Sequence, residues 1–173
     1  ALVLGASTIS GTLTVSTAGA ITQSGVLAVT GLTTLSAGAA NDITLANAAN
    51  TFSTVAVSSG NNVSLADADA LILGASTVSG TLTVAAGGAI SDSGNLLISG
   101  TSSFTVPNAT SITLDSAGNS FGGSVSFLAS AGSIQDVTVV DITSLDLQAL
   151  TLLGNLNVSA TGITQSGAFV VPG

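Results

Sequence analysis

The sequence predicts an all-β fold, a parallel β-helix (β-solenoid) of about seven coils, each with roughly 20–26 residues and three short strands. The first observation is a repeat: the segment from Ala1 to Gly25 returns as Ala70 to Gly94 (70 − 1 = 69), with 18 of the 25 positions identical. Self-similarity at a fixed period is typical of repeat architectures. The second observation is that short runs alternate apolar residues with Ser or Thr, which is the period of a β-strand. Apolar residues do not recur at helical spacing.

The 69-residue super-repeat divides again along the chain. Its first copy contains three stretches, 12–31, 32–54 and 55–80, and each holds three strand-like runs. Clusters of Gly, Asn, Ser and Asp, which are turn residues, separate the runs. We therefore expect each stretch to form one coil, with strands of successive coils about 4.8 Å apart. The copies cover about 1–69 and 70–142, with a shortened third copy at 143–173.

Inward side chains are predicted from the alternation in both copies. They include Leu13 and Val15 in the first copy and Leu82 and Val84 in the second. Stacked coils would bury them in one narrow core that no single coil could form.

A second pair of matching segments predicts tight corners. Asn50 and Phe52 in the first copy correspond to Asn119 and Phe121 in the second. Asn tolerates a left-handed backbone, so we expect it at the corner itself. The Phe two positions later would point inward and fill the core.

Length predicts a single domain spanning residues 1–173. The chain opens inside a repeat unit, so we expect it to be a segment of a longer protein. No run of apolar residues approaches the roughly 20 that a membrane-spanning helix requires, and we expect no membrane span.

The composition argues against most kinds of active site. The chain has no Lys, Arg, His or Cys, eight Asp and a net charge of −8. Acid–base catalysis, nucleophile activation and zinc binding rely on the missing side chains, and nucleic acid would be repelled. We therefore expect no enzyme activity, no cofactor and no nucleic-acid partner.

The repeats resemble those of the filamentous-haemagglutinin-like exoproteins, the large adhesins of Gram-negative bacteria that use two-partner secretion. The resemblance rests on the string ALILGASTVSGTLTVAAGGAI at 70–90, on ITQSG at 21–25 and 163–167, and on the Asn-x-Phe corners. It implies a right-handed β-helix that passes an outer-membrane transporter unfolded and folds at the cell surface. It also implies an extracellular location and a role in adhesion or filament building. The chain would be part of the shaft, because it lacks the Asn-Pro motifs of the secretion domain.

Asp67 and Asp69 are the candidates for a metal site. They alternate in LADADA and are expected on one side of a strand. Calcium needs six to eight oxygens, and the second copy does not repeat the pair, so solubilising charges at a turn are the favoured interpretation.

Three further patterns have a functional and a structural interpretation. Asp136, Asp141 and Asp146 could serve a polysaccharide hydrolase, but basic residues to hold an anionic polymer are absent. Thr12, Thr14, Thr81 and Thr83 form Thr-x-Thr pairs like those of ice-binding solenoids. Such a face needs the pair on nearly every coil, and here it occurs once per three.

Three sequons form the remaining candidate sites, for N-glycosylation. Their asparagines are Asn62, Asn108 and Asn157.

We expect a structural shaft of a bacterial adhesin or surface filament that stacks on flanking repeats or on neighbouring copies of the same protein. One alternative is a filament or sheath subunit without adhesive role. Another is a module that binds glycans or ice. Host or cell-surface glycans or proteins are candidate partners of the whole molecule.

Overall fold

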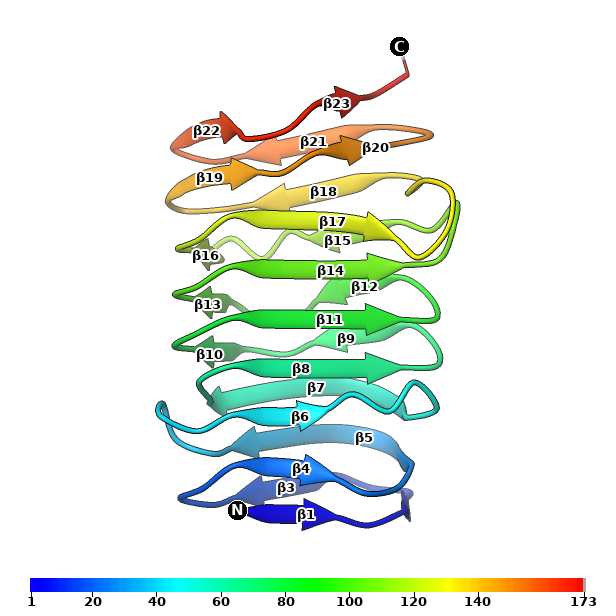
Figure 1. Cartoon of the computed structure of the whole chain (residues 1–173), viewed down its shortest axis with the longest axis vertical. Coiled ribbons are helices and arrows are strands. Elements are labelled where there is room, and N and C mark those ends of the chain that lie inside the picture. The colour runs from blue at the N-terminus through cyan, green and yellow to red at the C-terminus, as the bar shows by residue number, and fades with distance from the viewer. Residues whose placement is uncertain (173) are drawn as a thin grey trace.

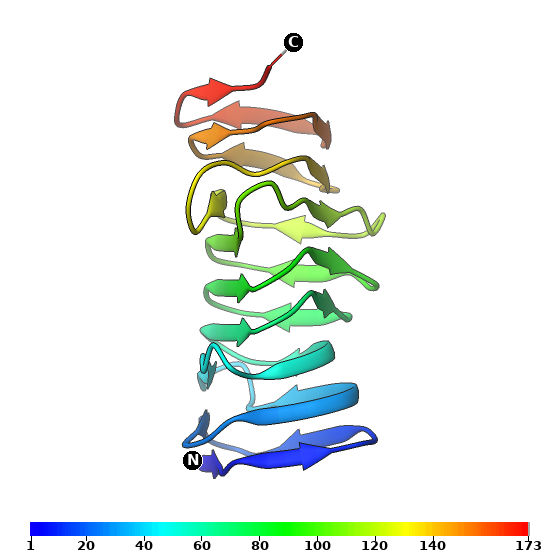
Figure 2. The same ribbon diagram turned by 90° about the vertical axis from the view of Figure 1, so that its right-hand side faces the viewer.

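The computed structural model describes residues 1–172, which form a β-solenoid without any helix (Figure 1). In Figure 1 the near strands run from left to right and the far strands return while the chain climbs from its N-terminus. This winding is right-handed. The view turned by 90° shows the turns stacked one above another (Figure 2). The predicted fold class is therefore confirmed.

The near side of the rod is a nine-stranded parallel sheet, which we call the front sheet. Its strands, in order along the rod, are β1 (Leu2–Leu4), β4 (Ile21–Gln23), β6 (Ile43–Leu45), β8 (Val63–Asp67), β11 (Leu82–Ala86), β14 (Ser102–Val106), β17 (Val125–Ala129), β19 (Ser144–Leu147) and β22 (Gly162–Gln165).

The far side is a second nine-stranded sheet, the back sheet. It contains β2 (Ser7–Ile9), β3 (Leu13–Ser16), β5 (Leu27–Ser36), β7 (Thr51–Ser59), β9 (Leu71–Leu73), β12 (Ile90–Asp92), β15 (Ile112–Leu114), β18 (Val137–Val140) and β21 (Leu156–Ser159). A three-stranded side sheet consists of β10 (Ser76–Val78), β13 (Leu96–Ile98) and β16 (Ser120–Phe121). The last pair is β20 (Leu150–Thr151) and β23 (Phe169–Val170).

The turns are shorter and more numerous than expected. The nine strands of the front sheet define about eight turns instead of seven. Between Leu2 and Val125, the sequence separation of paired front-sheet positions ranges from 21 − 2 = 19 to 125 − 102 = 23. The expectation of three strands per coil holds for five turns: the first (β1 to β3), the three that contain a side-sheet strand, and the turn of β19 to β21. Lower in the rod, β5 and β7 run through as single strands of 10 and 9 residues.

The core is one continuous column of apolar, mainly aliphatic side chains. In the front sheet, Ile21, Ile43, Val63 and Leu82 are successive partners with at most 3% of their surface exposed. The predicted inward residues are confirmed: Val15, Leu82 and Val84 are buried, and Leu13 packs half-buried near the N-terminal end. Each buried aliphatic side chain contributes about 1.5–3 kcal/mol relative to exposure.

The 69-residue super-repeat does not correspond to three whole coils, as the sequence division suggested. Residues that pair with one another from turn to turn form a column along the rod, which we call a file. One file in the back sheet consists of Leu13, Thr33, Val55, Leu73 and Asp92. Three turns thus lead from Leu13 to Leu73. The next nine residues (82 − 73 = 9) bring Leu82, the counterpart of Leu13, to the front sheet beside Val63. One super-repeat therefore spans about three and a half turns.

Successive copies consequently face opposite ways. Ile21 lies in the front sheet and its counterpart Ile90 in the back sheet, whereas Ile163 of the third copy returns to the front. The copies are related by a half-turn about the rod axis and a rise of about 17 Å, which is three and a half spacings of about 4.8 Å. Both faces require the same pattern, apolar inward and polar outward. One sequence unit therefore satisfies either face.

Candidate functional site

Among the buried polar side chains, the two corner asparagines make the most hydrogen bonds. Asn50 is fully buried and its amide joins three turns. Its Oδ1 accepts hydrogen bonds from the Leu27 amide at 2.9 Å and from Gln23 Nε2 at 2.8 Å. Its Nδ2 lies within hydrogen-bond distance of the carbonyls of Leu45 and Ala66, at 3.3 and 3.2 Å. Only a side chain with both a donor and an acceptor can make this set of bonds.

The second corner repeats this arrangement on the opposite face. Asn119 is also fully buried, and its Oδ1 accepts a hydrogen bond from the Leu96 amide at 2.8 Å. Its Nδ2 donates to the Leu114 carbonyl and, at 2.6 Å, to Asp92, which stands where the first copy has Gln23. The corner position was predicted correctly, but the reason was wrong. Among residues 1–172 positive φ occurs at Gly38, Ala109 and Gly132 and at neither asparagine. Asn is needed for its side-chain bonds.

The two corner phenylalanines are inward core residues, as expected. Phe52 and Phe121 are 3% and 1% exposed. Phe121 meets Phe104 edge to face at a centroid distance of 6.3 Å, and Phe104 stacks on Phe127 at 5.8 Å.

Asp67 and Asp69 do not form a shared site. Asp67 is 4% exposed, and its carboxylate accepts hydrogen bonds from the amides of Phe52 at 2.5 Å and of Asp69 at 2.8 Å. Burial raises the pKa of Asp67 above its ordinary value, although these two bonds act in the opposite direction. The Asp69 side chain is exposed. The expectation of a common side was wrong, because β8 ends at Asp67 and the chain turns there.

The aspartates of the hydrolase hypothesis are used by three separate local arrangements. Asp136 accepts from the Asn155 amide at 2.7 Å, and Asp146 accepts from Ser166 Oγ at 2.7 Å. Asp141 is 3% exposed and binds the amide and hydroxyl of Thr143 through Oδ1. Within residues 1–172 no group of three or more His, Cys, Asp or Glu side chains lies close enough to hold a metal ion.

All three sequon asparagines are exposed. Asn62 donates to Asp42 and accepts from Thr81, and Asn108 accepts from the Ser133 amide. Asn157 points outward from β21.

The Thr-x-Thr pairs lie on opposite faces, with Thr14 in the back sheet and Thr83 in the front sheet. A continuous row exists nevertheless, in a form that the sequence comparison missed. In six successive turns of the front sheet, the same outward position carries a hydroxyl: Thr22, Thr44, Ser64, Thr83, Ser103 and Ser126. The half-turn between copies joins residues of both copies into this single file.

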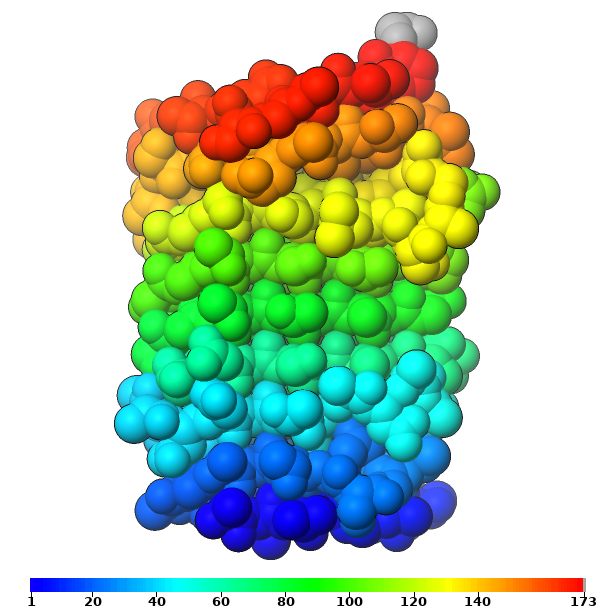
Figure 3. All heavy atoms as spheres, viewed as in Figure 1, coloured from blue at the N-terminus to red at the C-terminus, as the bar shows by residue number. Residues whose placement is uncertain are grey.

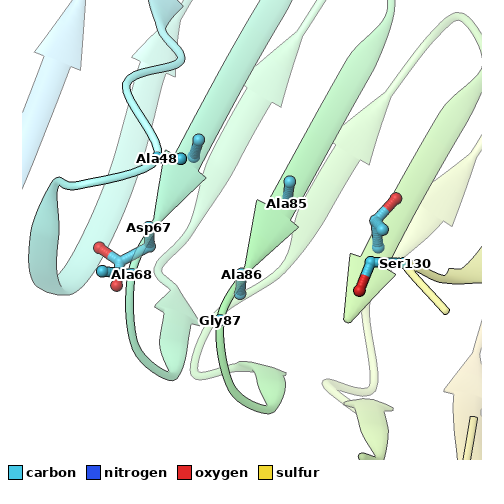
Figure 4. Close-up of a pocket in the computed structure, with 9 residues that line it drawn as sticks. Ala48, Asp67, Ala68, Ala85, Ala86, Gly87 and Ser130 are labelled. Carbon is cyan, nitrogen blue, oxygen red and sulfur yellow. The ribbon is translucent and has the colours of Figure 1, made fainter. Parts of the chain in front are cut away.

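A shallow hollow of about 310 Å³ lies beside this file at the ends of β8 and β11. Its lining is mainly Ala and Gly, including Ala66, Ala85 and Ala86. Figure 4 shows the Asp67 carboxylate turned away from Ala85 and Ala86. Asp67 is the acidic residue among the lining side chains, and both of its oxygens accept hydrogen bonds from backbone amides.

Two inward hydroxyls were also missed. Thr33 and Ser102 occupy the same place in the two copies (102 − 33 = 69) and are 0% and 2% exposed. Within the described part of the chain their hydroxyl oxygens have no hydrogen-bond partner, nor does Asp141 Oδ2. Their recurrence at the super-repeat spacing was the available signal.

The family comparison bears on the whole chain. A family model described as repeats of unknown function (DUF5649) matches residues 1–59, 60–128 and 134–173. The second matched segment has the super-repeat length (128 − 60 + 1 = 69). The chain belongs to this DUF5649 repeat family. No curated protein and no solved structure matches the chain. The described part of this DUF5649 chain contains no helix that is long and apolar enough to cross a membrane.

Proposed function

We propose that this DUF5649 segment is a non-catalytic structural shaft in an extracellular bacterial adhesin or surface filament. The observation that carries the proposal is the unbroken strand pairing of the front sheet from β1 to β22. Force along such a rod passes through every interface between turns, and at each interface the ladders of the sheets and the packed core carry it together. A repeat protein of this kind gains length without a new fold for each added unit.

The surface chemistry supports the same role. Outward positions on the front sheet carry Ser and Thr in six successive turns, and these residues keep a long strand-rich surface wetted. The chain has no Lys or Arg, so trypsin-like proteases find no cleavage site. Secretion through an outer-membrane transporter and a distal region that binds host or cell-surface glycans or proteins belong to this proposal. They rest on the resemblance to filamentous-haemagglutinin-like repeats.

The proposal is tested in the cells that make the whole protein. An epitope tag inserted in the exposed turn at 130–132 should label intact, unpermeabilised cells. Insertion of two further super-repeats, which restores the original facing, should move a tag beyond the segment outward by about 34 Å. Whatever the full molecule binds should still be bound. Labelling only after permeabilisation, or loss of binding after outward substitutions in this segment, would contradict the shaft role.

A filament or sheath subunit without adhesive role is the second candidate, because it requires the same stackable turns. The two are separated by deleting the segment together with its flanking repeats. A shaft deletion leaves the distal binding activity intact on a shorter molecule, whereas a sheath deletion removes the surface layer and has no binding activity to preserve.

A further inference from the structure

The outward surface of the front sheet is unusually regular. We define the hydroxyl face as the file Thr22, Thr44, Ser64, Thr83, Ser103 and Ser126 with its neighbours Ala66, Ala85 and Thr105. All of these side chains are short, and the strands beneath them are in unbroken register. Leu128, which pairs with Thr105 and is 44% exposed, borders the face at its C-terminal end. Figure 3, which views this face, shows the turns in the middle of the rod as roughly parallel bands, whereas the uppermost turns slope.

The carboxylates avoid this face. Seven of the eight lie at strand ends or in turns: Asp42, Asp67, Asp69, Asp92, Asp115, Asp136 and Asp141. The remaining one, Asp146, lies within β19, above the last strand of the hydroxyl face. In a chain of net charge −8, two copies would repel each other at most approaches. The positions that make up the hydroxyl face carry no carboxylate, so the repulsion is weakest there.

The corresponding file on the back sheet is interrupted. Thr14 and Thr34 are followed by Ala56, and the pairing of β5 with β7 contains two register shifts. Ile72 and Leu32 protrude outward nearby, 37% and 43% exposed. The back sheet therefore lacks a level strip of comparable length.

The size of the hydroxyl face sets the expected strength of a contact. Two of the six strands have three residues and four have five, so strands about 4.8 Å apart with about 3.3 Å per residue cover roughly 410 Å² per copy. A symmetric contact would bury roughly 820 Å² in total, which is below the 1,200 Å² or so of stable complexes and typical of weak ones. Every added turn lengthens the strip, so a longer rod would associate more tightly through many weak contacts.

We propose that the hydroxyl face is the surface through which a second copy of this chain docks side by side, sheet against sheet. The inference rests on the proposed structural role and names the lateral contact of that role. Short side chains let two sheets approach closely, and hydroxyls can donate and accept across the contact. The aspartates remain at the rim, where water screens them.

The half-turn between copies supplies a matched pair of variants. Thr83 and Thr14 share the sequence Gly-Thr-Leu-Thr-Val and are both exposed, but they lie on the front and back sheets respectively. Thr83→Glu places a charge in the contact, whereas Thr14→Glu adds the same charge outside it. Ser103→Glu and Thr34→Glu form a second such pair, both partly exposed.

The experiment is sedimentation equilibrium of the 173-residue chain over a wide concentration range, with small-angle scattering to measure the cross-section. We expect weak dimerisation that thickens the rod without lengthening it. Thr83→Glu and Ser103→Glu should weaken it at least tenfold, and Thr14→Glu and Thr34→Glu should leave it unchanged. Circular dichroism checks that every variant is folded.

Three results would overturn the inference: a monomer at millimolar concentration, equal effects of front and back variants, or dimers that double the length at constant cross-section. Binding of glycans or ice by a face that does not self-associate would assign it another occupant and equally overturn it. Surface labelling of cells does not depend on this contact, so the shaft proposal can stand when the lateral contact fails.

Discussion

Thr33 and Ser102 each place a hydroxyl in a mainly aliphatic column. Both are buried without a hydrogen-bond partner among residues 1–172, and a buried unpaired polar group costs about 1–3 kcal/mol. Thr33 has apolar partners in its file, Leu13 below and Val55 above. The recurrence of the hydroxyl in both copies is a local departure from the apolar pattern that the rest of the column follows.

We predict that Thr33→Val stabilises the folded chain by about 1 kcal/mol, because the substitution keeps the shape and removes the unpaired hydroxyl. Equilibrium unfolding in urea measures the change. Thr34→Val, on the outward side of the same strand, is the control and should alter stability by less. A loss of stability in Thr33→Val would show that the hydroxyl has a partner.

Asp67 gives a pH dependence whose sign follows from its burial. Its pKa is raised in the folded state above the ordinary value of 3.8. Between the two values the folded state holds more protons than the unfolded state, so stability falls as pH rises through this window. The contribution of the protonated form is complete below 3.8.

We therefore predict that the wild-type chain loses stability relative to Asp67→Asn as pH is raised from 3 towards 6. The substitution removes the titrating group and leaves the other seven aspartates in both proteins. Urea midpoints across this pH series provide the measurement. A relative gain for the wild type with rising pH would mean that the two amide bonds outweigh burial.

At the scale of the element, the asparagine corner is the unit that fixes how one turn follows another. The corner asparagine bonds to the turn below, to its own turn and, at Asn50, to the turn above. A fully buried amide with these partners cannot be replaced by an apolar side chain without leaving backbone groups unpaired. The corner asparagine bonds mainly to backbone groups, which both faces provide, so the same corner forms at Asn50 and, on the opposite face, at Asn119.

Asn50→Ala should destabilise the chain by about 2–4 kcal/mol, because the Leu27 amide loses its acceptor and a small cavity forms. Asn47→Ala is the matched control in the same corner. The Asn47 side chain accepts a hydrogen bond from the Ala49 amide in an exposed turn, so we expect a change below about 1 kcal/mol. Thermal unfolding of both variants tests the difference, and equal losses would assign the effect to the turn as a whole.

At the scale of the whole molecule, the half-turn relation between copies makes a specific prediction about length. Deletion of residues 13–81 removes one super-repeat and joins Thr12 to Leu82, which continues the same sequence pattern. The shortened chain should fold as a solenoid that is about 17 Å shorter. Small-angle scattering measures the length, and circular dichroism the strand content.

A deletion of three whole turns is the informative comparison. Removal of residues 13–72 joins Thr12 to Leu73, which lies in the same back-sheet file as Leu13. The spatial position is kept but the repeat is broken, so the corners no longer match their partners. We expect this variant to be the less stable of the two. The opposite order would show that position in the file matters more than the continuity of the repeat.

Sequence alone determined the parallel solenoid, the inward positions Val15, Leu82 and Val84, and the location of both corners. These features depend on alternation and on repetition, which are local properties visible in a single chain. It also determined which chemistry is absent from the side chains.

The tertiary structure decided the number of turns and the facing of each copy. The period of the super-repeat is compatible with three long turns or three and a half shorter ones, because front and back strands demand the same pattern. Only the pairing of Leu82 with Val63, instead of with the file of Leu13, distinguishes them. That pairing places Thr14 and Thr83 on opposite sheets and makes Thr83 part of the hydroxyl face. In the same structure Asp67 is buried beside Phe52, whereas Asp69 is exposed. These contacts form between neighbouring turns. The sequence could not reveal them because alternation specifies which side chains face inward or outward, but not which strand pairs with which in the next turn.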